Sequence, residues 1–162
     1  MYSNSAIVSL AIWVGILIAG VVFAAEEATV TATVTAENLS VHVDDGSVAY
    51  GTLALSASAN TVGTDTQFAS NSGNVTEDIN IRGTNTVAWT LASAIASNVY
   101  THEFSTNAGA LYLFMSTSQQ EFADAVAANS SQQFDLRITV PSSTSSGAQQ
   151  SADVTVTAVA ED

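Results

Sequence analysis

The sequence predicts an N-terminal hydrophobic α-helix joined to an all-β domain. Two observations predict this fold class. The first is an apolar stretch from Ala6 to Ala25, with no charged residue before Glu26. The second is a series of short runs after Ala28 in which apolar and polar residues alternate with period two, as in half-buried strands. We therefore expect a hydrophobic helix over 1–27 and an outer β domain over 28–162.

The apolar stretch reads AIVSLAIWVGILIAGVVFAA, and as a helix it spans ~30 Å, the thickness of a bilayer core. Three interpretations compete: a signal peptide, a membrane anchor, and the core helix of a filament. Met1 to Ser5 contain no Lys or Arg. A signal peptide has a basic start, and a membrane helix is oriented by basic flanks. The missing basic flank favours a helix that has lost a leader, sits first in the membrane, and later packs in a filament.

Small residues recur along this stretch with a spacing of four, which places them on one helical face. They are Ala11, Gly15 and Ala19, with Gly20 and Ala24 as a second pair. Such faces let helix backbones approach closely where no water drives association. We expect the helix to pack against other copies through this face and to form a helical homopolymer.

The remaining chain contains eight or nine runs that predict strands. They are Thr29–Thr35, Leu39–Val43, Ser47–Leu55, Val75–Arg82, Thr86–Leu91, Val99–Ser105, Ala110–Met115, Gln133–Val140 and Asp153–Ala160. Turn signals rich in Asn, Asp and Gly separate them. This spacing predicts an antiparallel β-sandwich of the Ig-like, Greek-key kind.

One stretch breaks the period-two pattern. From Ser118 to Ala128, Phe122 and Val126 recur at helical spacing, and Ser118 with Glu121 three residues later has the form of a capping box. We expect one short helix inserted between strands here. Pro141–Ser151 reads as an exposed loop before the last strand.

The charge balance excludes several functions. The chain has 15 acidic residues and only two basic ones, Arg82 and Arg137, for a net charge of −13. This charge repels nucleic acid and disfavours an anionic membrane surface. The chain has no cysteine, which excludes disulfides, thiolate chemistry and cysteine-based zinc sites.

Residues for catalysis or metal binding are scarce. His42 and His102 lie in alternating runs, where each is either a general base or metal ligand or, as we favour, a strand position. No nucleophile elbow, phosphate loop or HExxH motif occurs. Acidic side chains in loops offer oxygen ligands for calcium, but their spacing does not match an EF-hand; they are Asp44, Asp45, Asp65, Glu77 and Asp78. We expect no enzyme activity, cofactor or metal.

Three Asn-x-Ser/Thr sequons begin at Asn38, Asn74 and Asn129. Each abuts a predicted turn or element boundary, where a glycan is sterically admissible, so they are candidate N-glycosylation sites in an exported chain. Trp89, with Leu91, reads as a core residue in preference to a ligand platform.

The layout, an apolar segment from Tyr2 to Ala25 before one small domain, resembles a type IV pilin or archaellin subunit. The resemblance implies that a leader is cut just before the hydrophobic segment and that the helices bundle into the filament core. Bacterial type IV pilins typically have glutamate at the fifth position, where this chain has Ser5, and often a proline in the segment, where it has none. With its all-β domain, the chain looks more like an archaeal pilin.

These features predict a structural subunit of an extracellular surface filament, polymerising through its N-terminal helix and serving adhesion or motility. Its partners are other copies of the chain, the membrane before assembly, and a surface or carbohydrate target. Two alternatives stay open. One is a membrane-anchored surface binding module. The other is a secreted β protein that polymerises by donor-strand exchange, with Thr29–Thr35 inserting into a neighbour's sheet.

Overall fold

The computed structural model describes residues 27–161, of which residues 35–161 form one compact unit. This part of the chain contains ten β-strands and no helix. The strands are β1 (Val41–Val43), β2 (Ser58–Asn60), β3 (Gln67–Asn71), β4 (Glu77–Gly83), β5 (Thr90–Leu91), β6 (Val99–Ser105), β7 (Leu113–Phe114), β8 (Gln120–Val126), β9 (Ser131–Thr139) and β10 (Val154–Ala160).

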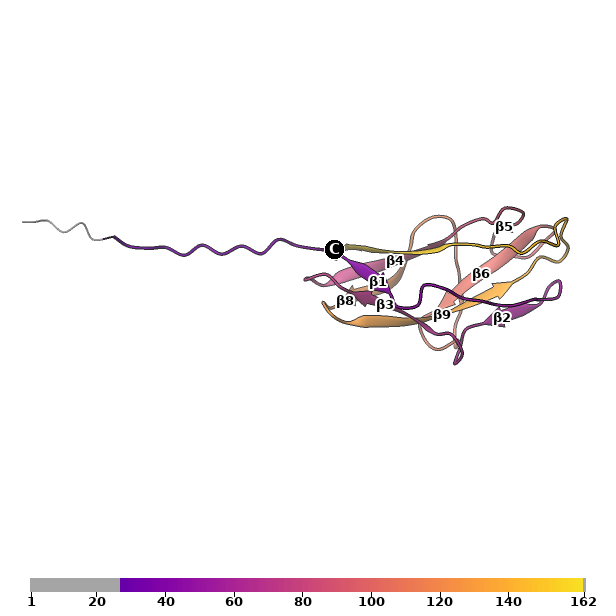
Figure 1. Cartoon of the computed structure of the whole chain (residues 1–162), viewed down its shortest axis with the longest axis horizontal. Coiled ribbons are helices and arrows are strands. Elements are labelled where there is room, and N and C mark those ends of the chain that lie inside the picture. Colours follow the sequence, from indigo (N-terminus) through magenta and orange to yellow (C-terminus); the bar gives the residue numbers. More distant parts are fainter. Residues whose placement is uncertain (1–26, 162) are drawn as a thin grey trace, which may run out of the picture. The chain divides into compact units, whose positions relative to one another are not determined.

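The strands form two sheets (Figure 1). The larger sheet has seven strands in the order β1-β3-β9-β6-β5, with β2 also paired to β9 and β7 to β6. The smaller sheet has three strands in the order β10-β4-β8. All pairs are antiparallel except β5 with β6, where Thr90 lies opposite Val99 in a parallel pair.

One hydrophobic core joins the two sheets. Its buried residues are Ala69, Ile79, Ile81, Leu91, Tyr100, Phe104, Met115, Phe122, Ala123, Val126, Phe134 and Leu136. Phe122 of the small sheet packs edge-on between two rings of the large sheet, 6.0 Å from the Phe104 centroid and 5.2 Å from that of Phe134. Edge-to-face contacts at these distances are favourable for aromatic rings.

The predicted fold class, an N-terminal helix joined to an antiparallel β-sandwich with an inserted helix, is not the fold that the structure shows. The described residues are all β, and the larger sheet contains a parallel pair. The stretch predicted as the inserted helix, Ser118–Ala128, holds strand β8. Phe122, Ala123 and Val126 are buried, whereas the two residues between Ala123 and Val126 are exposed. Register shifts against β4 interrupt the two-residue alternation of the strand, so its burial pattern resembles that of a helix. Pairing with β4 then overrides the local helical preference.

Strand boundaries differ from the prediction at several other places. Thr29–Thr35 and Ser47–Leu55 belong to no strand, whereas β6 matches its predicted range. Two strands, β2 and β3, were not predicted; both are short, polar and paired to β9. Pairing with a central strand supplies the stabilisation that their composition alone does not.

The predicted hydrophobic helix lies outside the described residues, as do the small residues of its predicted packing face: Ala11, Gly15, Ala19, Gly20 and Ala24. Between residues 27 and 161, no helix is long and apolar enough to cross a membrane.

Candidate functional site

A long groove lies between the 47–55 segment and the 144–152 segment, and its smaller lobe borders the edge strands β1 and β10 of the two sheets. In the large sheet β1 pairs only with β3, and in the small sheet β10 pairs only with β4. Within residues 27–161, no strand covers the outer edge of either β1 or β10. The β10 edge runs for seven residues, Val154–Ala160, without a charge, a proline or a break in register. Open edges of this kind are templates for pairing with another strand.

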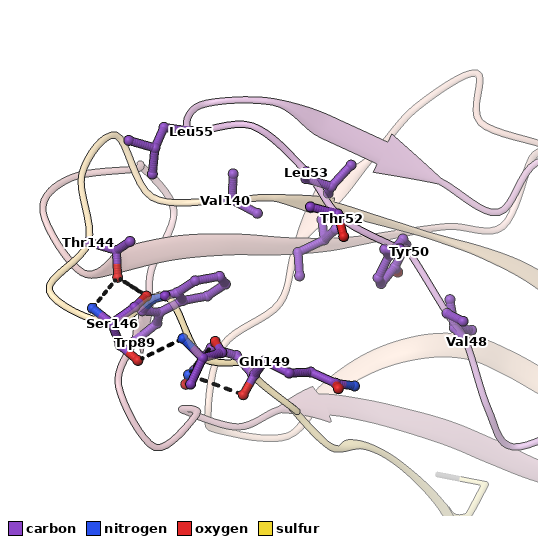
Figure 2. A pocket seen from close by; sticks show the side chains of 16 residues that line it. Val48, Tyr50, Thr52, Leu53, Leu55, Trp89, Val140, Thr144, Ser146 and Gln149 are labelled. Atoms are coloured by element: carbon purple, nitrogen blue, oxygen red, sulfur yellow. Dashed lines mark hydrogen bonds between the residues drawn. The ribbon is translucent and has the colours of Figure 1, made fainter.

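The groove has two lobes that share Val48 and Tyr50. The larger, of about 620 Å³, lies between the 48–55 segment and the 144–150 loop, over Trp89, Ile138 and Val140 (Figure 2). The smaller, of about 360 Å³, lies between residues 43–50 and residues 151–156, over His102, Phe134 and Leu136. Together they form a channel with an apolar floor supplied mainly by β9.

The walls of the groove are extended segments without a ladder partner. From Ser47 to Leu55, no backbone N–H donates a hydrogen bond to any group in the described part of the chain. The same holds for the N–H groups from Gln149 to Ala152, between the bonded residues Ala148 and Asp153. Backbone groups of this kind must bond to water or to an incoming chain.

The two walls run in opposite directions. Ser56 N–H donates to the Pro141 carbonyl at 3.1 Å, which closes the groove where the first wall ends and the second begins. At the other end, Val43 and Gly46, which precede the first wall, line the smaller lobe together with Val154 and Val156 of β10. An extended segment in the groove would therefore be parallel to one wall and antiparallel to the other.

Trp89 forms part of the floor and is held in place. Its indole Nε1–H donates to Thr144 Oγ1 at 2.9 Å, and its ring lies 6.1 Å from that of Tyr100. The residue packs against the core, as the sequence suggests, and also lines the groove. Figure 2 shows the ring beside Thr144 and Ser146, across the lobe from Leu53 and Tyr50.

The groove is almost uncharged, although the chain carries a net charge of −13. No acidic or basic residue lines the larger lobe. In the smaller lobe Asp153 is the one acidic residue. A neutral surface on a strongly acidic chain is a place where a second acidic copy meets little repulsion.

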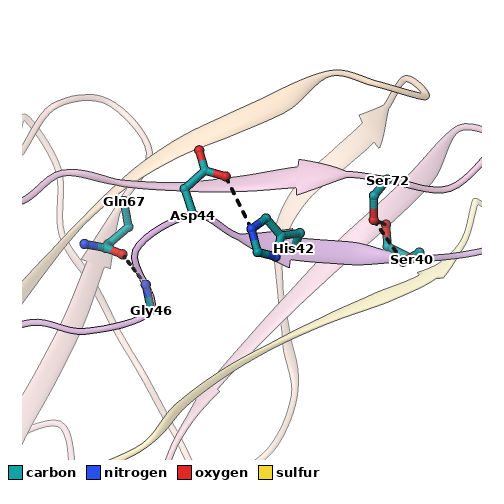
Figure 3. A network of polar contacts seen from close by, with 6 residues as sticks. All are labelled: Ser40, His42, Asp44, Gly46, Gln67 and Ser72. Carbon is teal, nitrogen blue, oxygen red and sulfur yellow. Dashed lines mark hydrogen bonds and ion pairs between the residues drawn. The ribbon is translucent and has the colours of Figure 1, made fainter.

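The first wall is tied to the large sheet by polar contacts around β1 (Figure 3). Gly46 N–H donates to Gln67 Oε1 at 3.3 Å, and Ser72 Oγ lies 2.9 Å from Ser40 Oγ. His42 lies on the exposed face of β1, with Nε2 3.8 Å from Asp44 Oδ1. An exposed pair at this distance is worth little to stability. His42 therefore occupies a solvent-facing strand position.

His102 lies in the floor of the smaller lobe, where it is 4% exposed. Its Nε2 is 3.0 Å from the Tyr50 hydroxyl, and its Nδ1 has no partner in the described structure. Burial lowers the pKa of the His102 imidazole to about 4, so the side chain is neutral at pH 7. Burial, with a smaller contribution from Asp65, raises the pKa of Tyr50. The pair is a neutral contact that holds the shared residue Tyr50 against the floor.

The buried His102 makes stability depend on pH. Its pKa is about 4 in the folded chain against 6.5 for the free side chain, so between these values the unfolded chain binds the extra proton. We expect this group to contribute about 3 kcal/mol above pH 6.5 and to lose that contribution as the pH falls to 4. Urea unfolding of the parent and of His102→Gln at several pH values tests this expectation. Between pH 6.5 and pH 4, the free energy of unfolding should fall more steeply with decreasing pH in the parent than in the variant. Parallel curves for the two chains would contradict the assignment.

Residues 36–40 are fastened to the turn between β3 and β4. Asn38 N–H donates to Asn74 Oδ1 and Asn74 Nδ2 donates to the Ala36 carbonyl, both at 2.8 Å. A Cβ on Gly73 would collide with the Asn38 carbonyl, so only glycine permits this approach. Two of the candidate glycosylation sites, Asn38 and Asn74, are thus in contact. The third, Asn129, is exposed in the turn before β9 with φ of 62°.

The acidic residues considered as calcium ligands are not brought together. Among residues 27–161, no three His, Cys, Asp or Glu side chains form a group that would hold a metal ion. Glu77 is fully buried, and its Oε2 accepts the Ser40 N–H at 3.1 Å. Asp65 Oδ1 accepts a hydrogen bond from Gln67 Nε2, and Asp78 Oδ1 accepts one from the Ala125 N–H, both at 2.8 Å. These three carboxylates therefore accept hydrogen bonds that hold backbone and side-chain groups of the domain in place.

Comparison of the chain with protein families, with curated proteins and with solved structures finds no match. Sequence reasoning did not find the groove, because it depends on which edges stay open. The one local signal was Ser47–Leu55, whose alternation predicts a strand and whose backbone is extended but unpaired.

Proposed function

We propose that this protein is a structural subunit of an extracellular surface filament that serves adhesion or motility, and that it is not an enzyme. The observation that carries the proposal is the groove between the 47–55 segment and the 144–152 segment, beside the open sheet edges. A domain with two uncovered sheet edges beside an apolar floor is built to receive another polypeptide. The chain is exported, inserted in the membrane through residues 6–25, and then assembled at the cell surface.

The groove bears on two assembly routes that the sequence leaves open, polymerisation through residues 6–25 and donor-strand exchange. Polymerisation through residues 6–25 stays a prediction, because that segment lies outside the described residues. The groove supports donor-strand exchange, because its walls carry backbone N–H groups without hydrogen-bond partners in the described structure. The two routes are compatible within one filament, with residues 6–25 at one contact and the groove at another.

Electron microscopy of the native material tests the proposal. We expect filaments after negative staining and a sedimenting polymer that resists mild denaturant, because each subunit contributes buried apolar area to its contacts. Discrete monomers, from a preparation in which the apolar segment is intact, would contradict it.

A second candidate function is a membrane-anchored surface module that binds carbohydrate. Trp89, Tyr50 and the amides of Gln149 and Gln150 line the same groove, and aromatic faces with nearby amides are typical of ligand pockets. Recovery of the protein only as a detergent-solubilised monomer that binds sugar would favour this function over a filament.

A further inference from the structure

We propose that the groove binds residues 29–35 of a second copy of this chain, which enter as an added strand between the Ser47–Leu55 wall and the wall formed by residues 144–152. This inference rests on the proposed function, because it names the partner and the segment that would link the subunits of the filament.

The backbone of the groove selects an extended polypeptide. Both walls present unpaired N–H groups, over Ser47–Leu55 on one side and Gln149–Ala152 on the other. The second wall leads into β10, of which Val154 and Val156 line the smaller lobe. A strand offers donors and acceptors along both of its edges, so it pairs with both walls at once. A sugar or a small metabolite has no such repeating backbone.

The side chains of residues 29–35 match the floor. Thr29 to Thr35 alternate strictly, which puts Val30, Ala32 and Val34 on one face and threonines on the other. Val30 is 90% exposed and Val34 is 96% exposed, and no strand includes either residue. Placed in the groove, the valine face meets Trp89, Ile138 and Val140, and the threonine face stays toward water.

The length and the charge of residues 29–35 also match those of the groove. Residues 29–35 span about 23 Å as a strand, and the wall Ser47–Leu55 spans about 30 Å. Residues 28–36 carry no charge, although acidic residues flank them at Glu27 and Glu37. The segment and the larger lobe are thus two neutral surfaces on a chain with a net charge of −13, and their contact avoids the repulsion that other contacts between copies would meet.

The proposed contact is head-to-tail, because the donated segment and the groove are different surfaces of the chain. Each copy that donates its segment still presents its own groove to the next copy. Head-to-tail contacts that do not close into a ring generate open filaments. The hydrogen bonds between residues 36–40 and the β3–β4 turn hold the C-terminal end of the donated segment on its own domain. The docked segment therefore links its own domain to the neighbouring copy.

The test compares two double variants of the full chain. Val30→Thr with Val34→Thr keeps shape and β propensity but puts hydroxyls against the apolar floor. We expect about a hundredfold weaker docking, seen as loss of sedimenting polymer, with an unchanged melting temperature for the monomeric domain. Thr31→Ser with Thr33→Ser changes the opposite face and serves as the matched control, which we expect to polymerise like the parent. Equal polymerisation of the valine variant and the parent would overturn the inference while leaving the proposed function standing.

Cross-linking gives a second readout that does not depend on filaments. The chain has no cysteine, so introduced ones are the only thiols. A Thr33→Cys chain is mixed with an Ala49→Cys chain, and a short bis-maleimide bridges them. We expect a covalent dimer of the two chains, and much less with Ala127→Cys, an exposed position outside the groove. Equal bridging at both positions would overturn the inference, as would preferential bridging within a single chain that carries both Thr33→Cys and Ala49→Cys. Absence of filaments from the parent chain, with bridging intact, would overturn only the proposed function.

Discussion

Phe122→Ala is expected to destabilise the domain by about 3–5 kcal/mol, because it opens a cavity where the two sheets meet. Phe122 is 7% exposed and lies between the rings of Phe104 and Phe134. It belongs to the small sheet and both neighbours belong to the large one, so the substitution removes the contact that joins the sheets. Equilibrium urea unfolding, followed by tryptophan fluorescence, measures the change.

Two variants bracket this prediction. Phe114→Ala removes the same side chain from a position that is 46% exposed, and we expect a loss of less than about 1 kcal/mol. Phe122→Leu keeps most of the volume and is expected to lose about 1.5 kcal/mol. If Phe122→Ala unfolded at the same urea concentration as Phe114→Ala, the aromatic contact between the sheets would not be a main source of stability.

Arg137→Met is expected to destabilise the domain by about 3 kcal/mol, because it leaves a buried carboxylate without a partner. Glu103 is 3% exposed, and Arg137 binds both of its oxygens, with Nε and Nη2 each 2.7 Å away. The guanidinium also lies 4.1 Å from the centroid of the Tyr112 ring. The hydrogen bonds that Arg137 donates to Glu103 raise the pKa of Arg137, which therefore stays charged at any pH at which the domain is studied.

Replacing Glu103 as well as Arg137 shows whether the loss of stability comes from burying an unpaired charge or from losing the attraction within the ion pair. In Glu103→Met with Arg137→Met no unpaired charge remains, and we expect most of the loss to be recovered. Arg82→Met is the matched control, since Arg82 is the other basic residue, is exposed, and forms no ion pair with any described residue. A double variant as unstable as Arg137→Met alone would show that packing of the arginine stem, and not its charge, matters here.

Local pattern predicted four of the longer strands well. β4, β6, β9 and β10 all alternate or carry β-branched runs, and each lies within two residues of its predicted range. Local pattern failed for β8, because register shifts against β4 interrupt its alternation and its apolar residues do not follow a two-residue period. It also failed for β2 and β3, which have three and five largely polar residues. These segments form strands because their backbones pair with β9.

The sequence by itself determined the all-β character of the domain, its acidic surface and the uncharged valine–threonine segment at residues 29–35. These follow from composition and from a two-residue period, which are local properties. Only the tertiary structure decided which edges remain open, and so where the groove lies. Edge exposure depends on the order of strands from distant parts of the chain, and the placement of β1 and β10 at the edges of different sheets is not encoded in either strand alone.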